Sequence, residues 1–575
     1  MAHTLPVVNT ELLERQRKRK QPKGRAVAPE VRAELWSWLG SAPPRRDLLI
    51  EYLHLINDRL GVLPVAHLAA LAQWMNLSQA EVFEVASFYH HFEVQKDGAA
   101  GVVTPPPALT VRVCEGLACE MAGARELLRR LPAILGREVR VKAAPCVGRC
   151  ESAPVAVVHQ HALAQASVAT VQVAVQAGHT QAQATAHIGY EAYRSAGGYA
   201  LLRECVGGLR SAESLIATLE DAGLRGLGGA GFPAGRKWRL VRAQPAPRLM
   251  AVNIDEGEPG TFKDRWYLER DPHRFLEGLL LAAWAVGVDA VYIYLRDEYP
   301  ACRAMLAAEL ERLRDEPPVP AQAGWAMPAL ELRRGAGAYI CGEESAMIES
   351  IEGKRGLPRL RPPYVAEVGL FGRPTLEHNF ETLYQVREIV EKGAAWFAAQ
   401  GRHGRKGLRN FSVSGRVAVP GVKLAPAGIT LRELVDEFCG GMQPGHELYA
   451  YLPGGASGGI LPAALADVPL DFDTLQPHGG FIGSAAVIVL SQHDRAVDAA
   501  RNVMRFFRDE SCGQCTPCRA GTAKASALLE APQWDLPLLA DLSQVMRDAS
   551  ICGLGQAAPN VMDCVIRHFS QELTS

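Results

Sequence analysis

Eight of the thirteen cysteines fall into two groups whose spacing suits iron-sulfur clusters. In "SCGQCTPCRAG", three cysteines are separated by two residues each, so one loop can direct three thiolates at one point. A remote fourth cysteine completes the spacing typical of a [4Fe-4S] cluster. Structural zinc is the alternative, but four-cysteine zinc sites usually use two separate Cys-x2-Cys pairs. The predicted ligands are Cys512, Cys515, Cys518 and Cys552.

The other group consists of two cysteine pairs, each on a loop that follows a predicted strand. Cys114-x4-Cys119 and Cys146-x3-Cys150 can supply two thiolates to each iron of a [2Fe-2S] cluster. Zinc and a redox dithiol remain alternatives, although the spacings fit neither a zinc knuckle nor Cys-x-x-Cys. Four further cysteines are predicted to be small buried residues, and the last lies in a glycine-rich loop. They are Cys205, Cys302, Cys439 and Cys564, and then Cys341.

A glycine-rich loop, "GLGGAGFPAGRKW", contains the Gly226-x-Gly228-x-x-Gly231 pattern of dinucleotide-binding turns. Such a turn must follow a strand and open a helix. Here the residues before the loop have helical periodicity, and the predicted strand "RLMAVNI" comes after it, so the Rossmann interpretation fails. The loop also lacks the Ser or Thr of a Walker motif. Its glycines and Lys237 still suit close approach to a phosphate-bearing ligand, with an ordinary turn as the alternative.

Two acidic segments come after this loop in the predicted domain. "NIDEGEPGTFKDR" follows a predicted strand, and "GAGAYICGEESAMIES" places two acids at a predicted helix N-terminus. Either segment alone is more often a solvated face or a helix cap. Beside glycine-lined turns at strand ends, they predict a pocket for ribose hydroxyls and a ring edge.

The elements that must position these residues form a multidomain α/β protein, because helical and strand periodicities alternate along the chain. We expect a disordered basic arm at 1–26, a helical bundle at 27–95, a small α/β unit with the first cysteine group at 105–175 and a linker at 176–200. An α/β domain at 201–405, a small β-rich domain at 410–492 and a helical domain around the second cysteine group at 496–575 follow.

The bulk composition excludes several classes. Lys plus Arg is 61 against 62 for Asp plus Glu, so no positive field exists to hold nucleic acid or an anionic membrane. The apolar stretch 276–295 is interrupted by acids and glycines and is predicted to be a buried helix running into a buried strand. Thirteen cysteines without a signal peptide argue against a disulfide framework. The chain is therefore expected to be cytoplasmic.

These motifs give the chain a specific resemblance. It resembles a fusion of two peripheral subunits of the respiratory complex I family: the thioredoxin-like [2Fe-2S] subunit over 27–175 and the NADH-oxidising FMN subunit over about 187–572. The run "CGEESAMIESIEGKRGLPRLRPPYVAEVGLFGRPTLEHNFETL" is most similar to the β subunit family of soluble NAD-dependent molybdenum or tungsten formate dehydrogenases. The diaphorase subunits of NAD-linked hydrogenases share the layout. The resemblance implies that 105–175 is a thioredoxin-like [2Fe-2S] domain, 201–405 an FMN/NAD-binding α/β domain, 410–492 a β-grasp-like domain and 496–575 a helical [4Fe-4S] domain.

The resemblance implies roles for individual residues. Gly226, Gly228 and Gly231 would approach FMN and the dinucleotide, Lys237 would contact the flavin phosphate, and Asn253, Asp255 and Glu256 would bind the flavin. Tyr339, Gly342 and Glu343 would lie behind it, with Asn379 at the phosphate end. Glu258 and Glu344 would position nicotinamide and ribose as the catalytic pair, and Phe232 would stack on adenine. Arg361 and Tyr364 also belong to this predicted cofactor set.

Four positions depart from the family pattern. Leu240 stands where a second adenine-stacking Phe is usual, Tyr364 replaces another Phe, Arg361 replaces Lys and His378 replaces Asn. Weaker stacking at Leu240 would change NAD affinity rather than chemistry. The cysteines of both groups match the family pattern.

The implied cofactors are FMN, NAD, one [4Fe-4S] cluster and one [2Fe-2S] cluster, and the implied reaction is hydride transfer between nicotinamide and flavin. No motif for formate oxidation is present, so a large molybdopterin-type α subunit carrying further iron-sulfur clusters would supply the electrons. A hydrogenase or complex I-like diaphorase is the alternative of the same class. A non-catalytic scaffold with structural zinc is the alternative of another class.

Overall fold

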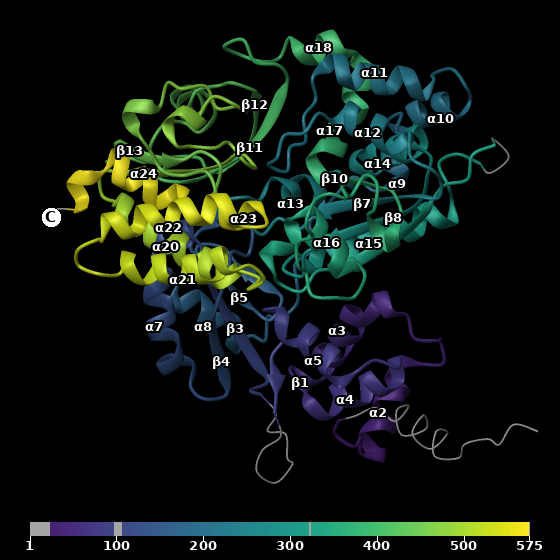
Figure 1. Cartoon of the computed structure of the whole chain (residues 1–575), viewed down its shortest axis with the longest axis horizontal. Helices are drawn as coiled ribbons and strands as arrows, with labels where there is room; N and C mark the ends of the chain where they lie inside the picture. The colour runs from purple at the N-terminus through teal and green to yellow at the C-terminus, as the bar shows by residue number, and fades with distance from the viewer. Residues whose placement is uncertain (1–23, 97–105, 321–323, 574–575) are drawn as a thin grey trace, which may run out of the picture. The chain divides into compact units, whose positions relative to one another are not determined.

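The computed structural model describes residues 24–96, 106–320 and 324–573, which divide into two compact units (Figure 1). The smaller unit takes in residues up to Pro106 together with the later segment Glu352–Arg355, and the larger unit takes in the rest. Most of the predicted basic arm, 1–26, lies outside the described residues.

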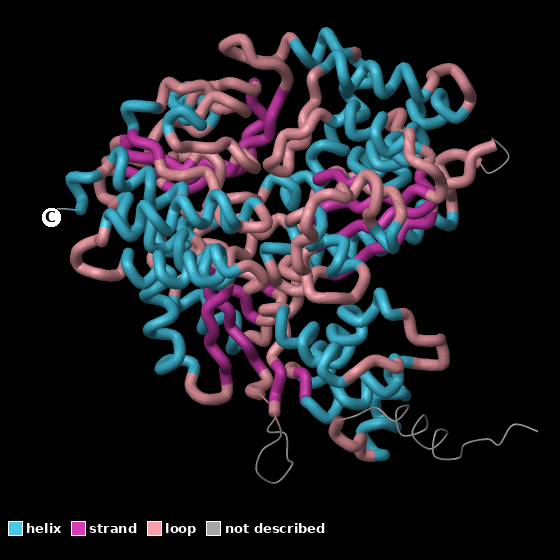
Figure 2. The backbone as a smooth tube through the Cα atoms, in the orientation of Figure 1, coloured by secondary structure: helices cyan, strands magenta, loops and turns pink. Residues whose placement is uncertain are grey.

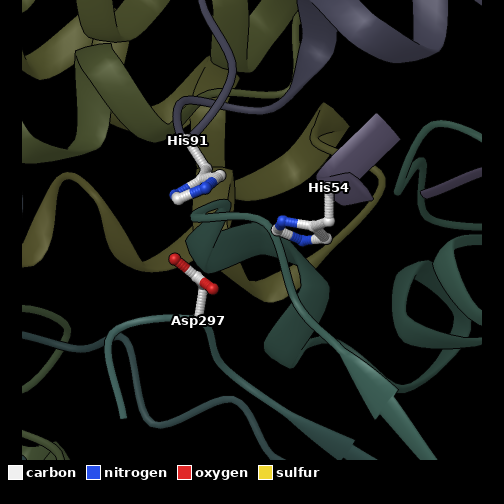
Figure 3. A group of neighbouring side chains, drawn as sticks. All are labelled: His54, His91 and Asp297. Atoms are coloured by element: carbon white, nitrogen blue, oxygen red, sulfur yellow. The ribbon is translucent and has the colours of Figure 1, made fainter. Parts of the chain in front are cut away.

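The smaller unit is helical, and its helices bury leucine and isoleucine at helical spacing. Leu49, Leu53 and Ile56 of α3 are buried, and α3 ends at Gly61, which takes the left-handed conformation that favours glycine. The rings of His54 and His91 lie 4.9 Å apart. Figure 3 labels both residues and also Asp297, which belongs to the larger unit. The elements are α2 (Pro29–Leu39), η1 (Arg46–Leu48), α3 (Leu49–Leu60), β1 (Leu63–Pro64), α4 (Val65–Met75), α5 (Gln79–Phe88) and β2 (Val94–Gln95).

The larger unit begins with a four-stranded sheet in the order β4-β3-β5-β6, where β3 pairs with β4 in parallel and with β5 antiparallel. Val111 and Val113 alternate inward on β3, and α7 packs its buried Leu127 and Leu131 against them. Both cysteine pairs follow strands of this sheet, as predicted. The elements are β3 (Leu109–Cys114), α6 (Leu117–Met121), α7 (Ala124–Leu135), β4 (Val139–Ala144), η2 (Cys150–Ser152), β5 (Ala156–Val158), β6 (His161–Leu163) and α8 (Val168–Gln176).

A parallel sheet in the order β10-β7-β8-β9 follows, with helices packed around it (Figure 1). The apolar stretch 276–295 is confirmed as a buried helix, α14, that runs into a buried strand, β8. The first elements are α9 (Tyr190–Ser195), α10 (Ala200–Val206), α11 (Ala212–Ala222), α12 (Ala234–Arg242), β7 (Arg248–Ile254), α13 (Lys263–Leu268), α14 (Pro272–Val286) and β8 (Val288–Leu295). The later ones are α15 (Pro300–Asp315), β9 (Ala329–Arg334), η4 (Tyr339–Gly342), α16 (Glu344–Ile351), η5 (Leu370–Gly372), β10 (Thr375–Asn379), α17 (Phe380–Lys392) and α18 (Ala394–Ala398).

The last third of the larger unit combines a five-stranded mixed sheet, in the order β12-β11-β15-β13-β14, with a C-terminal group of helices (Figure 2). The sheet region contains β11 (Leu408–Gly415), β12 (Gly421–Pro426), α19 (Leu431–Glu433), η6 (Leu434–Phe438), β13 (Leu448–Leu452), β14 (Leu461–Pro462), η7 (Ala463–Leu465), η8 (Gln476–His478) and β15 (Ala486–Ser491). The helices are α20 (Ala496–Glu510), α21 (Thr516–Leu529), α22 (Leu536–Ala549), α23 (Gly553–Ala557), α24 (Asn560–His568) and η9 (Ser570–Leu573).

The linker predicted at 176–200 is wrong in its second half. Residues 190–195 form α9, and Tyr190, Tyr193 and Tyr199 are buried in the core of the parallel-sheet region. The Ala- and Gln-rich composition just upstream led to the linker prediction, although the three tyrosines that follow belong to the core. Throughout the described residues, no helix is both long enough and apolar enough to cross a membrane.

Candidate functional site

The glycine loop follows a helix, α11, and leads into another, α12, so its context differs from a Rossmann turn, as predicted. A bridge between Arg225 and Pro233 closes the loop at its base. A Cβ on Gly228 would lie 2.9 Å from the Cβ of Asn379, the cap residue of α17. The Leu227 amide also donates to the Thr382 hydroxyl at 3.0 Å. The loop therefore passes closely over the N-terminus of α17, a position that suits a phosphate.

The end of β7 meets the η4 turn at a second part of the site. The Asn253 amide donates to the carbonyl of Gly342 at 2.8 Å, and a Cβ on Gly342 would lie 3.3 Å from the Asp255 carbonyl. A Cβ on Gly257 would lie 3.3 Å from the Tyr339 ring. The predicted flavin-pocket segments are thus brought together, and glycines stand where these segments approach most closely.

Asp255 carries the clearest sign of a missing polar partner. Its Oδ2 atom is buried and has no hydrogen-bond partner among the described residues. Burial raises the pKa of this carboxyl well above its ordinary value. A buried oxygen that nothing satisfies is costly, so a donor from a bound ligand fits this position. The unpaired Asp255 oxygen and the polar groups gathered around it fit a flavin, whose ring carries hydrogen-bond donors and acceptors.

Glu256 uses its side chain for structure. Its carboxylate accepts hydrogen bonds from the Asp264 and Arg265 amides at the start of α13, at 2.8 and 3.1 Å, and from the Tyr299 hydroxyl at 3.0 Å. Burial, with the Asp264 charge, raises the pKa of Glu256 to about 7. The Arg296 guanidinium also donates to the Glu256 carbonyl, so the backbone amide is the group of Glu256 that is left for a ligand.

Glu258 is held by the five-stranded sheet region. It accepts hydrogen bonds from the Ser457 amide at 2.9 Å, from the Ser457 hydroxyl at 2.5 Å and from the Ser484 hydroxyl at 3.1 Å. Burial raises its pKa, and these hydrogen bonds oppose the shift. The five-stranded sheet region thereby fixes the position of Glu258, one of the two acids expected to position nicotinamide.

Glu344, the other acid of that pair, lies between two cations at the N-terminus of α16. Its carboxylate is 2.9 Å from Arg361 and 4.0 Å from Lys237. Lys237 also contacts the Glu377 carboxylate at 3.3 Å and its carbonyl at 3.0 Å. Glu343 caps α16 by accepting from the Ser345 and Ala346 amides, and it pairs with Arg361. The predicted acids and cations therefore form one charged rim.

The residues expected near adenine are exposed, and His378 is not. Phe232, Leu240 and Tyr364 are 39%, 44% and 55% exposed, as an open nucleotide surface requires. His378 is buried and accepts from the Trp238 indole at 2.8 Å, and burial lowers its pKa well below the ordinary value. His378 is thus a neutral residue of the packed interior. Where the family pattern has two asparagines, this chain has His378 and Asn379, and Asn379 is the one that contacts the glycine loop.

The cysteines of the C-terminal helices gather beside the flavin pocket. A Cβ on Gly555 would lie 2.8 Å from the Cβ of Cys518, which joins the α23 turn to the three-cysteine loop. The Tyr339 amide donates at 3.0 Å to Glu510, at the end of α20 and two residues before Cys512. Cys518 is buried, whereas Cys512, Cys515 and Cys552 are partly exposed.

The other four cysteines are buried and converge. Cys146 and Cys150 have sulfurs 3.5 Å apart, and Cys114 is hydrogen-bonded to both Cys119 and Cys146, contacts that raise the pKa of Cys114 well above its ordinary value. A Cβ on Gly116 would lie 3.5 Å from the Cys114 sulfur and 3.7 Å from the Cys146 sulfur. Four converging buried thiols are a donor set that suits a [2Fe-2S] cluster.

Arg296 joins this cysteine site to the flavin pocket. Its guanidinium donates to the Cys146 carbonyl at 2.7 Å and to the Glu256 carbonyl, and it is almost fully buried. Arg265, also buried, donates to the Gly148 carbonyl at 2.9 Å and pairs with Glu151. Two arginines after β7 and β8 therefore hold the second cysteine loop of the thioredoxin-like region.

Three family models match separate parts of this chain. Residues 37–178 match the thioredoxin-like [2Fe-2S] ferredoxin, residues 219–388 match the Nuo51 FMN-binding domain, and residues 498–575 match the iron-sulfur binding region of NADH-ubiquinone oxidoreductase F. The predicted FMN, [2Fe-2S] and [4Fe-4S] cofactors are thereby confirmed at the level of domains.

Curated relatives cover the larger part of the chain. The second F-type NADH-quinone oxidoreductase subunit of Rhizobium meliloti is 41% identical over 392 residues, which are 67% of this chain and 93% of the relative. The chain belongs to the family of NADH-quinone oxidoreductase flavoprotein subunits. The mitochondrial NADH-ubiquinone oxidoreductase 51 kDa subunit of Neurospora crassa is 39% identical over 381 residues, 64% of this chain and 77% of the relative.

The likeness extends to the N-terminal domains in one solved structure. A chain of the NAD+-reducing [NiFe]-hydrogenase in the H2-reduced state has a TM-score of 0.80 and 33% identity, and the match covers 92% of both chains. The fused arrangement of domains is therefore shared with a known redox protein.

Several site residues escaped the sequence analysis. Ser457 and Ser484 contact the predicted site residue Glu258, yet neither belongs to a motif near the glycine loop or the acidic segments. Glu377 contacts Lys237 and lies in the quoted run two residues before Asn379, but no role was assigned to it. Arg265 had a local signal, since it ends the quoted segment "NIDEGEPGTFKDR". Arg296 follows a strand end, where polar residues of a parallel sheet commonly enter a site.

Proposed function

We propose that this chain is the NAD(H)-oxidising electron-transfer subunit of a cytoplasmic formate dehydrogenase complex. The observation that carries the electron-transfer part is the position of Tyr339, which lies against Gly257 in the Asp255 segment and donates its amide to Glu510, two residues before Cys512. A flavin in that pocket would supply the exchange between two-electron and one-electron chemistry. Two links support electron transfer to the cysteine sites: Arg296 contacts both Glu256 and Cys146, and Tyr339 contacts Glu510 beside the C-terminal cysteine loop.

The chain's own residues would bind and orient rather than carry protons. Asn253, Asp255 and the Glu256 main chain would hold the flavin ring, and Asn379 with the α17 N-terminus would face its phosphate. Glu258 and Glu344 would orient nicotinamide and ribose. Lys237 would exchange its present Glu377 partner for the phosphate. Phe232 would stack on adenine, with Leu240, Arg361 and Tyr364 on the same surface.

The eight clustered cysteines would be the cluster ligands. Four would hold the [2Fe-2S] cluster and four the [4Fe-4S] cluster, in the sets that their spacing predicts. The partly exposed [4Fe-4S] loop suits electron entry from a partner subunit. The proposed partner is a large molybdopterin subunit, with molybdenum or tungsten, that carries further iron-sulfur clusters.

Formate as the electron source is supported by the similarity of 341–383 to formate dehydrogenase β subunits. The NAD-reducing hydrogenase alternative is favoured by the match to that enzyme's chain over 92% of both sequences. The two assignments differ only in the partner subunit.

The deciding experiment is an assay of the complex that co-purifies with this chain. Formate-dependent reduction of NAD+ supports the proposal, and hydrogen-dependent reduction supports the alternative. Absence of flavin and iron-sulfur absorption from the purified protein would contradict both.

A further inference from the structure

We propose that this chain has a second anion site, a cavity that binds a phosphate dianion behind the glycine loop. The cavity, of about 250 Å³, lies between the start of the glycine loop, the connection leading into β11 and the turn at 471–472. We call it the arginine cavity. The residues that matter for binding are Arg225, Arg405, Lys406, Arg409, Asp471 and Phe472.

The charges that line the arginine cavity are unbalanced. Asp471, its single carboxylate among the lining residues, contacts both Arg405 at 2.7 Å and Arg409 at 3.0 Å. Arg225 pairs outside the lining with Asp473 at 2.8 Å. Lys406 is exposed and forms no hydrogen bond or ion pair with any described residue. Four cations thus share two carboxylates.

Arg409 is the most deeply buried of these cations and carries an unused donor. It is 3% exposed, and its Nε atom is buried without a hydrogen-bond partner among the described residues. Burial, together with the nearby Arg225 and Arg405 charges, lowers its pKa even though the Asp471 and Glu381 carboxylates oppose the shift. A buried guanidinium with an unused donor is costly unless an acceptor is present. An anion in the cavity would provide that acceptor.

Phe472 holds two of the cations in fixed planes. The guanidiniums of Arg225 and Arg409 both lie 4.2 Å from the centre of its ring. Such stacking restricts rotation, so the N–H groups are oriented before any ligand arrives. Oriented guanidinium forks match the oxygen geometry of phosphate.

The size of the cavity selects the ligand class. Pockets for drug-sized ligands usually exceed about 300 Å³, while a water molecule takes about 30 Å³. At about 250 Å³ the arginine cavity suits a phosphate or a small phosphomonoester rather than a dinucleotide. The ligand would also brace the glycine loop, because Arg225 donates to the Gly231 carbonyl at 2.6 Å.

Calorimetric titration of the flavin- and cluster-loaded full chain with inorganic phosphate, at constant ionic strength set by chloride, tests the site. We expect saturable binding that Lys406→Gln and Arg405→Gln each weaken about tenfold, or about 1.4 kcal/mol. Arg402→Gln is the matched control, because Arg402 is on the same connection but pairs with Glu437 and does not line the cavity. Its binding should equal that of the wild type.

Two further titrations identify the source of the phosphate and test whether it binds outside the nucleotide site. Tighter binding of glycerol 3-phosphate than of inorganic phosphate assigns a phosphomonoester, and the reverse order assigns free phosphate. Saturating NADH should leave the binding unchanged. Three results would overturn the proposal: no saturable binding of either probe up to about 10 mM, loss of binding with NADH, or equal binding by all three variants.

Discussion

The two cysteine sites differ in what encloses them. The four cysteines at 114–150 are at most 4% exposed, and Arg265 and Arg296 of the parallel-sheet region hold one of their loops. In the C-terminal helices, three of the four cysteines are partly exposed. The four cysteines of the first site come from one region and one of their loops is held by another, whereas the second site is assembled by neighbouring helices. Burial favours a site sealed from partners, and exposure favours electron exchange with another protein.

Removing one ligand from each site should have the largest effect. Cys150→Ser is expected to cost about two of about six irons per chain, and Cys515→Ser about four, because each cluster needs all its thiolates. Iron analysis and EPR spectroscopy of the reduced protein measure this. Cys205→Ser, a buried cysteine outside both sites, is the control. Loss of both EPR signals from either variant would show that the sites are not independent.

Adding a methyl group beside each cysteine site should show that the two sites differ in how tightly they are packed. In Gly555→Ala the new Cβ would lie 2.4 Å from the Ser550 hydroxyl and 2.8 Å from the Cys518 Cβ, so atoms must shift at a cost of about 1–3 kcal/mol. In Gly116→Ala the nearest atoms lie at 3.5 Å, an ordinary contact. We expect Gly555→Ala to lower the thermal unfolding midpoint and the [4Fe-4S] content.

Gly116→Ala should leave the [2Fe-2S] content near the wild-type value. If Gly116→Ala proved the more damaging of the two, the cluster would need the space that this glycine leaves, and the steric comparison would be wrong.

Replacing Arg296 tests whether its buried positive charge affects the reduction potential of the neighbouring [2Fe-2S] cluster. In Arg296→Gln, the lost positive charge should make reduction of the [2Fe-2S] cluster harder by about 1 kcal/mol, which is about 40 mV for one electron. Redox titration followed by EPR measures the potential. Arg303→Gln is the control, since Arg303 pairs with Asp297 at 2.9 Å. An equal shift at the [4Fe-4S] cluster would mean that the change is structural rather than local.

The smallest expected effect lies away from both sites, at His273. This buried imidazole contacts the Tyr199 hydroxyl and the Glu309 carboxylate, both at 2.8 Å, and burial lowers its pKa. The folded state keeps it neutral, while the unfolded state binds a proton below about pH 6.5. Stability from this group is therefore present above that pH and is lost as the pH falls, by at most about 1.4 kcal/mol per unit.

His273→Asn should unfold at lower denaturant concentration than the wild type at about pH 7.5, with both EPR signals intact. The difference between the two proteins should narrow towards about pH 5.5, because the wild type loses this stability as the unfolded imidazole takes up a proton. A difference that stays constant across this range would contradict the assigned pKa direction.

Much of the fold was predictable because its signals are local. The buried helix and strand at 276–295 and the cysteine loops follow from periodicity and spacing within short windows. The half of the predicted linker that contains α9 was misjudged, because Tyr190 and Tyr193 are buried by contacts made far along the chain. Tyr193, for instance, donates to Glu277 at 2.6 Å.

The candidate site divides in the same way. The glycines and acids were recognisable by type and clustering, but Ser457 reaches Glu258 across 199 positions. No local pattern marks a serine for that contact, and only the packing of two domains creates it. The role of Glu256 was also hidden, because sequence cannot show that its carboxylate turns towards α13 rather than the pocket.

The buried arginines between the domains, Arg265 and Arg296, have a consequence for how the two domains assemble. Without the thioredoxin-like region, Arg265 and Arg296 would lose the acceptors at Gly148 and Cys146 that offset their desolvation. Two separate chains would have to find each other by collision before these charges were satisfied, at a rate set by their concentrations. Joining them in one polypeptide makes the encounter intramolecular. Fusion thus guarantees equal numbers of the two domains and assembly that does not depend on expression level.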